Sequence, residues 1–303
     1  MVVAHVERAG RSPLTWIASA VAGTPRLVGS IPPTAQVLLG IVSVQVGAAF
    51  AKQLFSVAGS SGVVTLRLVF AAAVLLLIWR PSWPAKRDLP VILSYGVVLA
   101  TMNVLFYLSL ERIPLGIAVT VEFLGPLAVA LLGSRRILDV LWALLAAGGV
   151  VLLAQSTVGA DTVGLLFALG AGVCWAAYIL LSAALGSRSS DGSGLALAMA
   201  CAGLVAAPFG IADAGSALLS PTVLVVGLGV ALMSSVIPYS LELEALRKIP
   251  PRVFGVLMSM EPAVAAVAGL LVLSEALTPL QWVAICCVVA ASAGATRTAR
   301  PDV

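Results

Sequence analysis

Charged residues are scarce in this chain. Only 10% of its 303 residues are Asp, Glu, Lys or Arg, whereas 61% are hydrophobic and the mean hydropathy is +1.12. A soluble globular chain has about 25% charged residues, so a soluble enzyme is excluded. The composition is instead typical of an integral membrane protein that places most of its residues inside the bilayer.

Histidine and cysteine are also scarce, which limits the chemistry that the chain can perform. The single histidine, His5, has no neighbour suited to catalysis or metal binding, and the sequence contains no P-loop or nucleophile elbow. We therefore predict no enzyme, no metal site, no cofactor and no ATP-driven pump. The four cysteines all lie inside apolar runs and form no disulfide or zinc pattern: Cys174, Cys201, Cys286 and Cys287.

Long apolar runs dominate what is present. Ten of them follow one another with short turns between, and each is long enough for a membrane helix. Because the runs are continuously apolar instead of alternating, they predict an all-α integral membrane protein and not a barrel. The predicted helices span residues 35–56, 62–79, 89–109, 114–133, 138–155, 163–182, 195–211, 222–244, 250–273 and 280–295.

The two halves of the chain resemble each other. An offset of 136 residues aligns Ile113, Pro114, Pro126, Ala130 and Gly133 with Ile249, Pro250, Pro262, Ala266 and Gly269. Two repeats of five helices, 35–155 and 163–296, are therefore predicted. Because five is an odd number, the second repeat enters the membrane in the opposite direction, which is the inverted-repeat plan of secondary transporters.

Basic residues predict how the chain is oriented. Fourteen of the 17 Lys and Arg residues fall on the side of the predicted helices that holds both termini, and one, Arg112, falls on the other side. The positive-inside rule then places both termini in the cytoplasm. Residues 1–34 imitate a signal peptide, but cleavage would reverse this bias, so we expect an uncleaved cytoplasmic tail. The bases lie in short gaps and not on one soluble face, so no nucleic-acid partner is expected.

Two glutamates lie deep inside predicted membrane helices. Glu122 precedes Pro126 by one turn, and Glu261 directly precedes Pro262, where a proline interrupts the backbone hydrogen bonds. A charged side chain at the centre of a membrane helix costs about 2.5–3.5 kcal/mol on insertion scales, so such residues usually face a cavity or a partner. We expect both to bind cargo or protons; the alternative is a structural hydrogen bond between helices.

Other polar side chains inside the spans complete the predicted site. Lys52 and Arg67 are expected nearer the outer face, where a role in the site and snorkelling to the interface both stay open. Glu242 is expected to be a solvated charge near the cytoplasmic end of its helix. Five further residues are candidates for lining a cavity: Asn103, Tyr107, Trp175, Tyr178 and Tyr239. For Asn103, Tyr107 and Tyr239, the alternative is hydrogen bonding between helices.

Two segments, 112–136 and 235–266, carry a family resemblance. They contain Val121-Glu-Phe-Leu-Gly-Pro126 and Met260-Glu-Pro262, and they resemble the threonine/homoserine exporter branch of the EamA-type drug/metabolite transporters. The likeness extends from about residue 35 to 296. It implies a plasma-membrane exporter of amino acids or related metabolites, with a central cavity between two five-helix halves and acidic sites at Glu122 and Glu261.

The expected activity is secondary transport by alternating access. A small zwitterionic amino acid needs an anionic partner for its ammonium group, which Glu122 and Glu261 can supply. Lys52, Asn103 or backbone amides near a proline can bind its carboxylate. A carboxyl group that faces inward and outward in turn can carry a proton, so we expect proton antiport. Export of another metabolite or drug and a facilitative, channel-like carrier remain the alternatives.

Overall fold

The described part of the chain is helical. The computed structural model describes residues 31–81, 83–132, 137–156, 161–186, 193–246, 248–249 and 251–298, so nearly all of the predicted tail lies outside these residues. Eight helical spans are long and apolar enough to cross a membrane, and two shorter apolar helices, Leu115–Leu131 and Leu138–Leu153, complete the set. The prediction of an all-α, multi-pass membrane protein with ten helical spans is confirmed.

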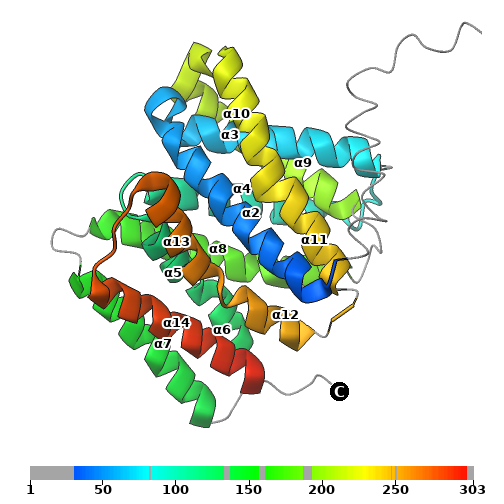
Figure 1. The fold of residues 1–303 in the computed structure, drawn as a ribbon. Helices are drawn as coiled ribbons and strands as arrows, with labels where there is room; N and C mark the ends of the chain where they lie inside the picture. Colours follow the sequence, from blue (N-terminus) through cyan, green and yellow to red (C-terminus); the bar gives the residue numbers. More distant parts are fainter. Residues whose placement is uncertain are drawn as a thin grey trace, which may run out of the picture.

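Several of the ten spans contain more than one element (Figure 1). In chain order the elements are α2 (Pro33–Gln53), α3 (Phe55–Trp79), α4 (Leu89–Leu110), α5 (Leu115–Glu122), α6 (Leu124–Leu132), α7 (Ile137–Ser156), α8 (Thr162–Gly186), α9 (Ser193–Ala214), η1 (Gly215–Leu219), α10 (Pro221–Ala231), η2 (Leu232–Val236), α11 (Ile237–Leu246), α12 (Pro251–Met258), α13 (Glu261–Leu273) and α14 (Pro279–Thr298). The fourth, eighth and ninth spans are each divided near their middle.

Prolines explain the breaks in the fourth and ninth spans. A proline has no backbone N–H, so the carbonyl four residues before it has no helical donor. Pro126 removes the donor for Glu122, and Pro262 removes the donor for Met258. These two residues end α5 and α12. The sequence placed prolines at both positions, and the structure shows that each one divides its helix.

The second span begins earlier than the sequence predicted. Residues 59–62 are Gly-Ser-Ser-Gly and resemble a turn, but α3 already begins at Phe55 and continues through them. Gly59 takes φ +60° and ψ 166°, which is a conformation that glycine accepts readily, and the helix kinks there. Arg67 consequently lies near the middle of α3 and not at its beginning, contrary to prediction.

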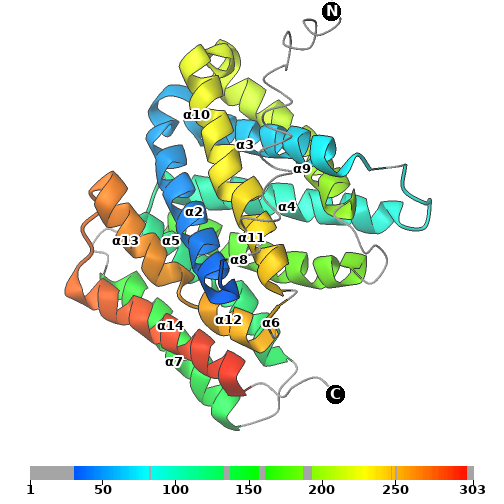
Figure 2. The same cartoon turned by 45° about the vertical axis from the view of Figure 1, so that its right-hand side comes forward.

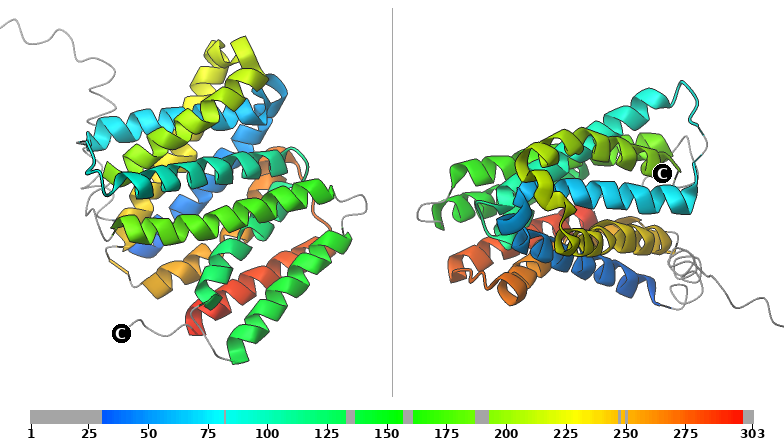
Figure 3. Two further views of the ribbon diagram at one scale, coloured as in Figure 1. Left: turned by 180° about the vertical axis from the view of Figure 1, so that it is seen from behind. Right: turned by 90° about the horizontal axis from the view of Figure 1, so that it is seen from above.

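Each span of the first half packs against a span of the second half. α3 packs on α9, α4 on α8, and α7 on α14, while α2 contacts α11 and α13, and α5 contacts α13. α7 and α14 lie side by side along one edge of the molecule (Figures 1 and 2). From behind, α4 lies between α9 and α8 (Figure 3). The core therefore lies largely between the halves.

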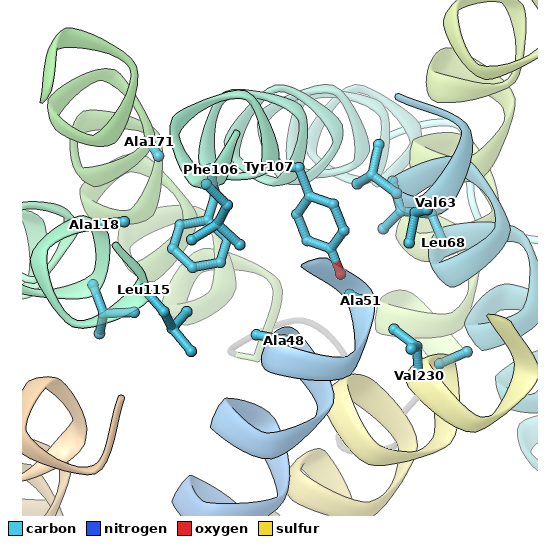
Figure 4. Packing of buried hydrophobic residues seen from close by; sticks show 14 of the residues in the cluster. Ala48, Ala51, Val63, Leu68, Phe106, Tyr107, Leu115, Ala118, Ala171 and Val230 are labelled. Atoms are coloured by element: carbon cyan, nitrogen blue, oxygen red, sulfur yellow. The ribbon is translucent and has the colours of Figure 1, made fainter. Parts of the chain in front are cut away.

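Small side chains allow these helices to approach closely. Ala48 and Ala51 on α2 are buried, and Tyr107 points from α4 toward α2 beside Ala51 (Figure 4). A Cβ added to Gly116 on α5 would lie 2.7 Å from Ala266 on α13, so these two backbones leave no room for a larger residue. Close backbone contact of this kind stabilises helix pairs in lipid, where hydrophobic burial between helices contributes little.

Candidate functional site

A cavity of about 540 Å³ lies among helices of both halves. This volume is in the range of small-molecule sites. Its wall is mostly apolar, with polar side chains contributed by α2, α3, α4, α5, α8, η2, α11, α13 and α14. These polar residues are Gln45, Arg67, Asn103, Glu122, Trp175, Tyr178, Ser182, Ser234, Tyr239, Glu242, Glu261, Ser292 and Thr296.

The structure brings six of the eight predicted site residues to the wall of this one cavity. They are Asn103, Glu122, Trp175, Tyr178, Tyr239 and Glu261. Tyr107 is fully buried behind the wall, where its hydroxyl accepts a hydrogen bond from Arg67. Lys52 lies elsewhere. The two acids named from the sequence therefore share one cavity, although they are 139 positions apart in the chain.

Glu261 begins α13 and is held by a neighbour on α2. Gln45 Nε2 donates to Glu261 Oε1 at 2.9 Å, and both side chains are buried. The other oxygen of each group, Glu261 Oε2 and Gln45 Oε1, has no hydrogen-bond partner in the described part of the chain. Two buried acceptors without donors favour a ligand that brings N–H groups, because an unsatisfied buried polar atom is costly.

Glu122 is the last residue of α5, directly before the break that separates α5 from α6. It is 7% exposed, and its carbonyl faces α8, where a Cβ added to Gly172 would lie 2.6 Å away. The next residue, Phe123, packs edge to face on Trp175 with ring centroids 5.5 Å apart. The break and the glycine together allow α8 to approach the carboxylate-bearing turn, so that Trp175 and Glu122 face the same space.

The remaining predicted wall residues are fixed by their own contacts. Asn103 Nδ2 donates to Leu99 O at 2.8 Å within α4. Tyr178 stacks on Tyr95 with ring centroids 5.0 Å apart, which joins α8 to α4. Asn103 thus has its amide nitrogen engaged by its own helix, and the position of Tyr178 is set by an aromatic pair behind the wall.

Arg67 is a wall residue that sequence reasoning placed too near the membrane surface. It is 8% exposed, and its guanidinium donates to Ser235 Oγ at 3.3 Å, Ser234 O at 3.0 Å and Tyr107 Oη at 3.4 Å. It also lies 5.6 Å from the centroid of the Tyr107 ring. Snorkelling to the outer interface is therefore wrong for Arg67, which supplies a positive charge to the cavity.

Glu242 is a second wall residue that the sequence prediction left out. It was expected to be a solvated charge near a helix end, but the structure places it on the cavity wall, close to Gly40 of α2. Its position reflects the packing of α11 on α2, which helix length alone does not reveal. Among the described residues, three carboxyl groups and one guanidinium thus line the cavity.

Lys52 joins three elements away from this cavity. Its Nζ lies 2.7 Å from Glu275 Oε1 and 2.9 Å from Ile113 O, and Glu275 Oε2 accepts a hydrogen bond from Leu115 N at 2.8 Å. The end of α2, the start of α5 and the segment after α13 are tied together here. Lys52 therefore does not line the cavity; its side chain is 20% exposed and its charge is paired with Glu275.

Known proteins resemble this chain over most of its length. A family model described as the EamA-like transporter family matches residues 162–297. The Threonine/homoserine exporter RhtA of Escherichia coli (strain K12) is 45% identical, and that of Salmonella typhimurium (strain LT2) is 44% identical, each alignment covering 89% of this chain and 93% of the relative. A crystal structure with 21% identity covers 88% of this chain and 97% of its own, with a TM-score of 0.58, and it supports the fold alone. The chain belongs to the EamA-like transporter family.

Proposed function

We propose that this chain exports threonine, homoserine or related small amino acids across the plasma membrane. Its relatives in two bacteria are named for export of these two amino acids. The observation that carries the proposal is a cavity large enough to hold an amino acid, whose wall offers both an arginine and buried carboxylates.

The charges of the wall suit a zwitterion. Arg67 supplies donors for a carboxylate, while Glu122, Glu242 and Glu261 supply acceptors for an ammonium group. Among the described wall residues, one guanidinium cannot neutralise three carboxylates, and buried charges without partners are costly. The excess of acid favours cations, which the ammonium group of the cargo and protons both provide.

Alternating access between two inverted repeats, 35–155 and 163–296, is supported by the packing. In the proposed repeat, α2 is equivalent to α8, and α4 is equivalent to the eighth span, which contains α11. The contact between α2 and α11 therefore has its equivalent in the contact between α8 and α4. α3 and α9 are equivalent to each other, as are α7 and α14, and each of these two pairs is in contact. The bounds of α5, 115–122, and of α12, 251–258, also differ by the offset of 136. Such correspondence favours duplication.

We infer that the cavity opens toward the cytoplasm, where both termini lie. The wall includes Thr296 near the end of α14 and Phe254 near the start of α12, on the side of the two termini. At the opposite ends of the helices, Lys52 and Glu275 tie α2 to α5 and to the segment after α13. The charge count of the loops supports the same orientation.

Proton antiport is the coupling that the carboxyl groups favour. A carboxyl group that meets the two sides of the membrane in turn can release a proton on one side and accept one on the other. Inward proton movement then drives the cargo outward. A facilitative carrier would use the same wall without this exchange, so the two are separated by their response to a pH gradient.

The test is transport by the purified full chain in proteoliposomes. Labelled threonine should exchange with unlabelled threonine, and an imposed pH gradient should drive net movement against a threonine gradient. Glu122→Gln and Glu261→Gln keep the side-chain shape and remove the charge, so each should reduce transport strongly. The control is Glu111→Gln, because Glu111 is exposed and away from the cavity.

Three results would contradict parts of this proposal. No exchange of any amino acid by wild type would mean that the cargo is another metabolite or drug. Exchange without a response to the pH gradient would leave a facilitator. Wild-type rates in both cavity variants would reduce Glu122 and Glu261 to structural residues.

A further inference from the structure

Arg67 is a buried cation that forms no ion pair with any residue that the structure describes. It is 8% exposed and lines the cavity, yet no carboxylate oxygen of a described residue lies within ion-pairing distance of its guanidinium. Glu122 is close enough for an electrostatic interaction with Arg67, but the two side chains form no hydrogen bond or ion pair. A buried charge without a counter-ion is strongly unfavourable, so this position favours an anionic group from a ligand.

The hydrogen bonds of Arg67 leave a matched pair of donors. A guanidinium has five N–H groups. Nε donates to Ser235, Nη1 to Tyr107 and Nη2 to Ser234, which leaves one N–H on each terminal nitrogen without a partner among the described residues. A carboxylate accepts two such N–H groups at once, and this paired contact is shorter and stronger than a neutral hydrogen bond.

The π-helical turn η2 holds the guanidinium in place. A π turn frees backbone groups that an α-helix would pair, and such turns are frequent at functional sites. Here the carbonyl of Ser234 accepts from Arg67, and the carbonyl of Met233 accepts from Ser43 Oγ on α2 at 2.7 Å. The turn is thus fixed from both sides, by α3 and by α2.

We propose that Arg67 binds the carboxylate of the cargo with these two N–H groups, and that Ser235 and Tyr107 position it for this contact. The inference rests on the proposed export of amino acids and makes it more specific. The cavity then selects molecules with a free carboxylate, and amino alcohols or amides of the same size are poor ligands. Ser235 and Tyr107 are positioning residues that act through Arg67.

The orientation of the bound cargo follows from the polar groups of the same cavity wall. Glu261 Oε2 and Gln45 Oε1 are buried acceptors that receive no hydrogen bond from the described residues, so they suit an ammonium group. The carboxylate end of the cargo therefore lies against α3 and η2, and the ammonium end lies against α13 and α2. Both ends contact elements from the two halves of the chain, which couples binding to their relative position.

Ligand binding to the purified full chain separates this inference from the proposed function. The probes are threonine and threoninol, which replaces the carboxylate with a neutral CH₂OH group. Their affinities are measured from the rise in melting temperature with ligand concentration, which needs no transport. The variants are Arg67→Gln, Arg67→Lys and Ser235→Ala. Arg112→Gln is the matched control because Arg112 is exposed and pairs with Asp161 away from the cavity.

Wild type should bind threonine at least 10-fold more tightly than threoninol. Arg67→Gln should weaken threonine binding by about 10- to 100-fold, the range for losing charge-assisted hydrogen bonds, and change threoninol binding less than about 3-fold. Arg67→Lys should recover only part of the loss, since a lysine has no paired donors. Arg112→Gln should match wild type.

Equal losses for threonine and threoninol, or no loss in Arg67→Gln, would overturn the inference. If Arg67→Gln does not fold, Ser235→Ala decides instead, because it removes one positioning bond and keeps the charge. It should weaken threonine binding by about 3- to 10-fold and leave threoninol unchanged; an unchanged threonine affinity overturns the positioning role. Failure of wild type to bind or exchange any amino acid would contradict the proposed function itself.

Discussion

The ion pair between Lys52 and Glu275 should stabilise the end of the molecule opposite the start of α2 and the end of α14, and its contribution can be measured. Each partner also contacts backbone, since Lys52 donates to Ile113 O and Glu275 accepts from Leu115 N. The perturbations are Lys52→Met, Glu275→Gln and the double variant. Either single change leaves the other charge partly buried beside a group that no longer neutralises it.

The exposure of the pair sets the expected magnitude. The two side chains are 20% and 16% exposed, which lies between a surface pair and a buried pair. Surface pairs contribute about 0–1 kcal/mol, whereas breaking a buried pair costs about 3–5 kcal/mol. We therefore expect each single variant to lose about 2 kcal/mol of unfolding free energy, or about 4 °C in melting temperature for a chain of this size. The coupling energy should be about 1–2 kcal/mol.

A double-mutant cycle on the detergent-solubilised protein provides the measurement. The control cycle uses Arg112 and Asp161, which are bonded at 2.6 Å but have side chains that are 42% and 31% exposed. Its coupling should be smaller because water screens an exposed pair. A coupling for Lys52 and Glu275 that equals or falls below the control would refute the argument from burial.

Two further predictions concern the charge at Asp161 and the orientation of the chain. The hydrogen bond from Arg112 lowers the pKa of Asp161, so Asp161 stabilises the fold above the ordinary pKa of an aspartate and this stabilisation is lost as pH falls through the lowered value. The melting-temperature difference between wild type and Asp161→Asn should therefore stay constant from pH 8 to pH 5 and shrink only below about pH 4; shrinkage near pH 6 would contradict it. For the orientation, in a variant without native cysteines, Ser216→Cys should react with an impermeant thiol reagent outside intact cells and Trp83→Cys should not, and the reverse pattern would overturn it.

Residue spacing was enough to predict the ten spans and the two acids. Continuous apolar runs predict membrane helices because lipid cannot satisfy backbone polar groups, and Glu122 and Glu261 are conspicuous because charge is so costly there. Their convergence on one cavity follows from the packing of α5 and α13, which residue spacing did not predict. The prolines at 126 and 262, in contrast, indicated where the helices would open.

Arg67, Glu242 and Lys52 show where spacing was insufficient. Arg67 was placed too near the surface because Gly59 to Gly62 resembles a turn, yet the helix kinks there and continues. Glu242 reaches the cavity through the packing of α11 on α2, and Lys52 is removed from it by an acid 223 positions away. The π turn η2, which holds Arg67, has no signal in apolar periodicity. The depth of these side chains in the molecule and the identity of their partners therefore could not be predicted without the tertiary structure.

The contact between Gly172 and the broken fourth span offers a last test of how the site is built. Pro126 leaves the Glu122 carbonyl without a helical donor, and Gly172 lets α8 approach this carbonyl, where an added Cβ would lie 2.6 Å from the oxygen. Gly172→Ala should therefore force the two elements apart and cost about 1–3 kcal/mol of unfolding free energy, although alanine is the better helix former by about 1 kcal/mol. Gly148→Ala in α7 is the matched control, because nothing lies within 4 Å of its added Cβ, and it should be neutral or stabilising. Melting temperatures of the two variants measure the difference. If Gly172→Ala is as stable as Gly148→Ala, the close approach of α8 is not required, and the position of Glu122 must be set by α5 and α6 alone.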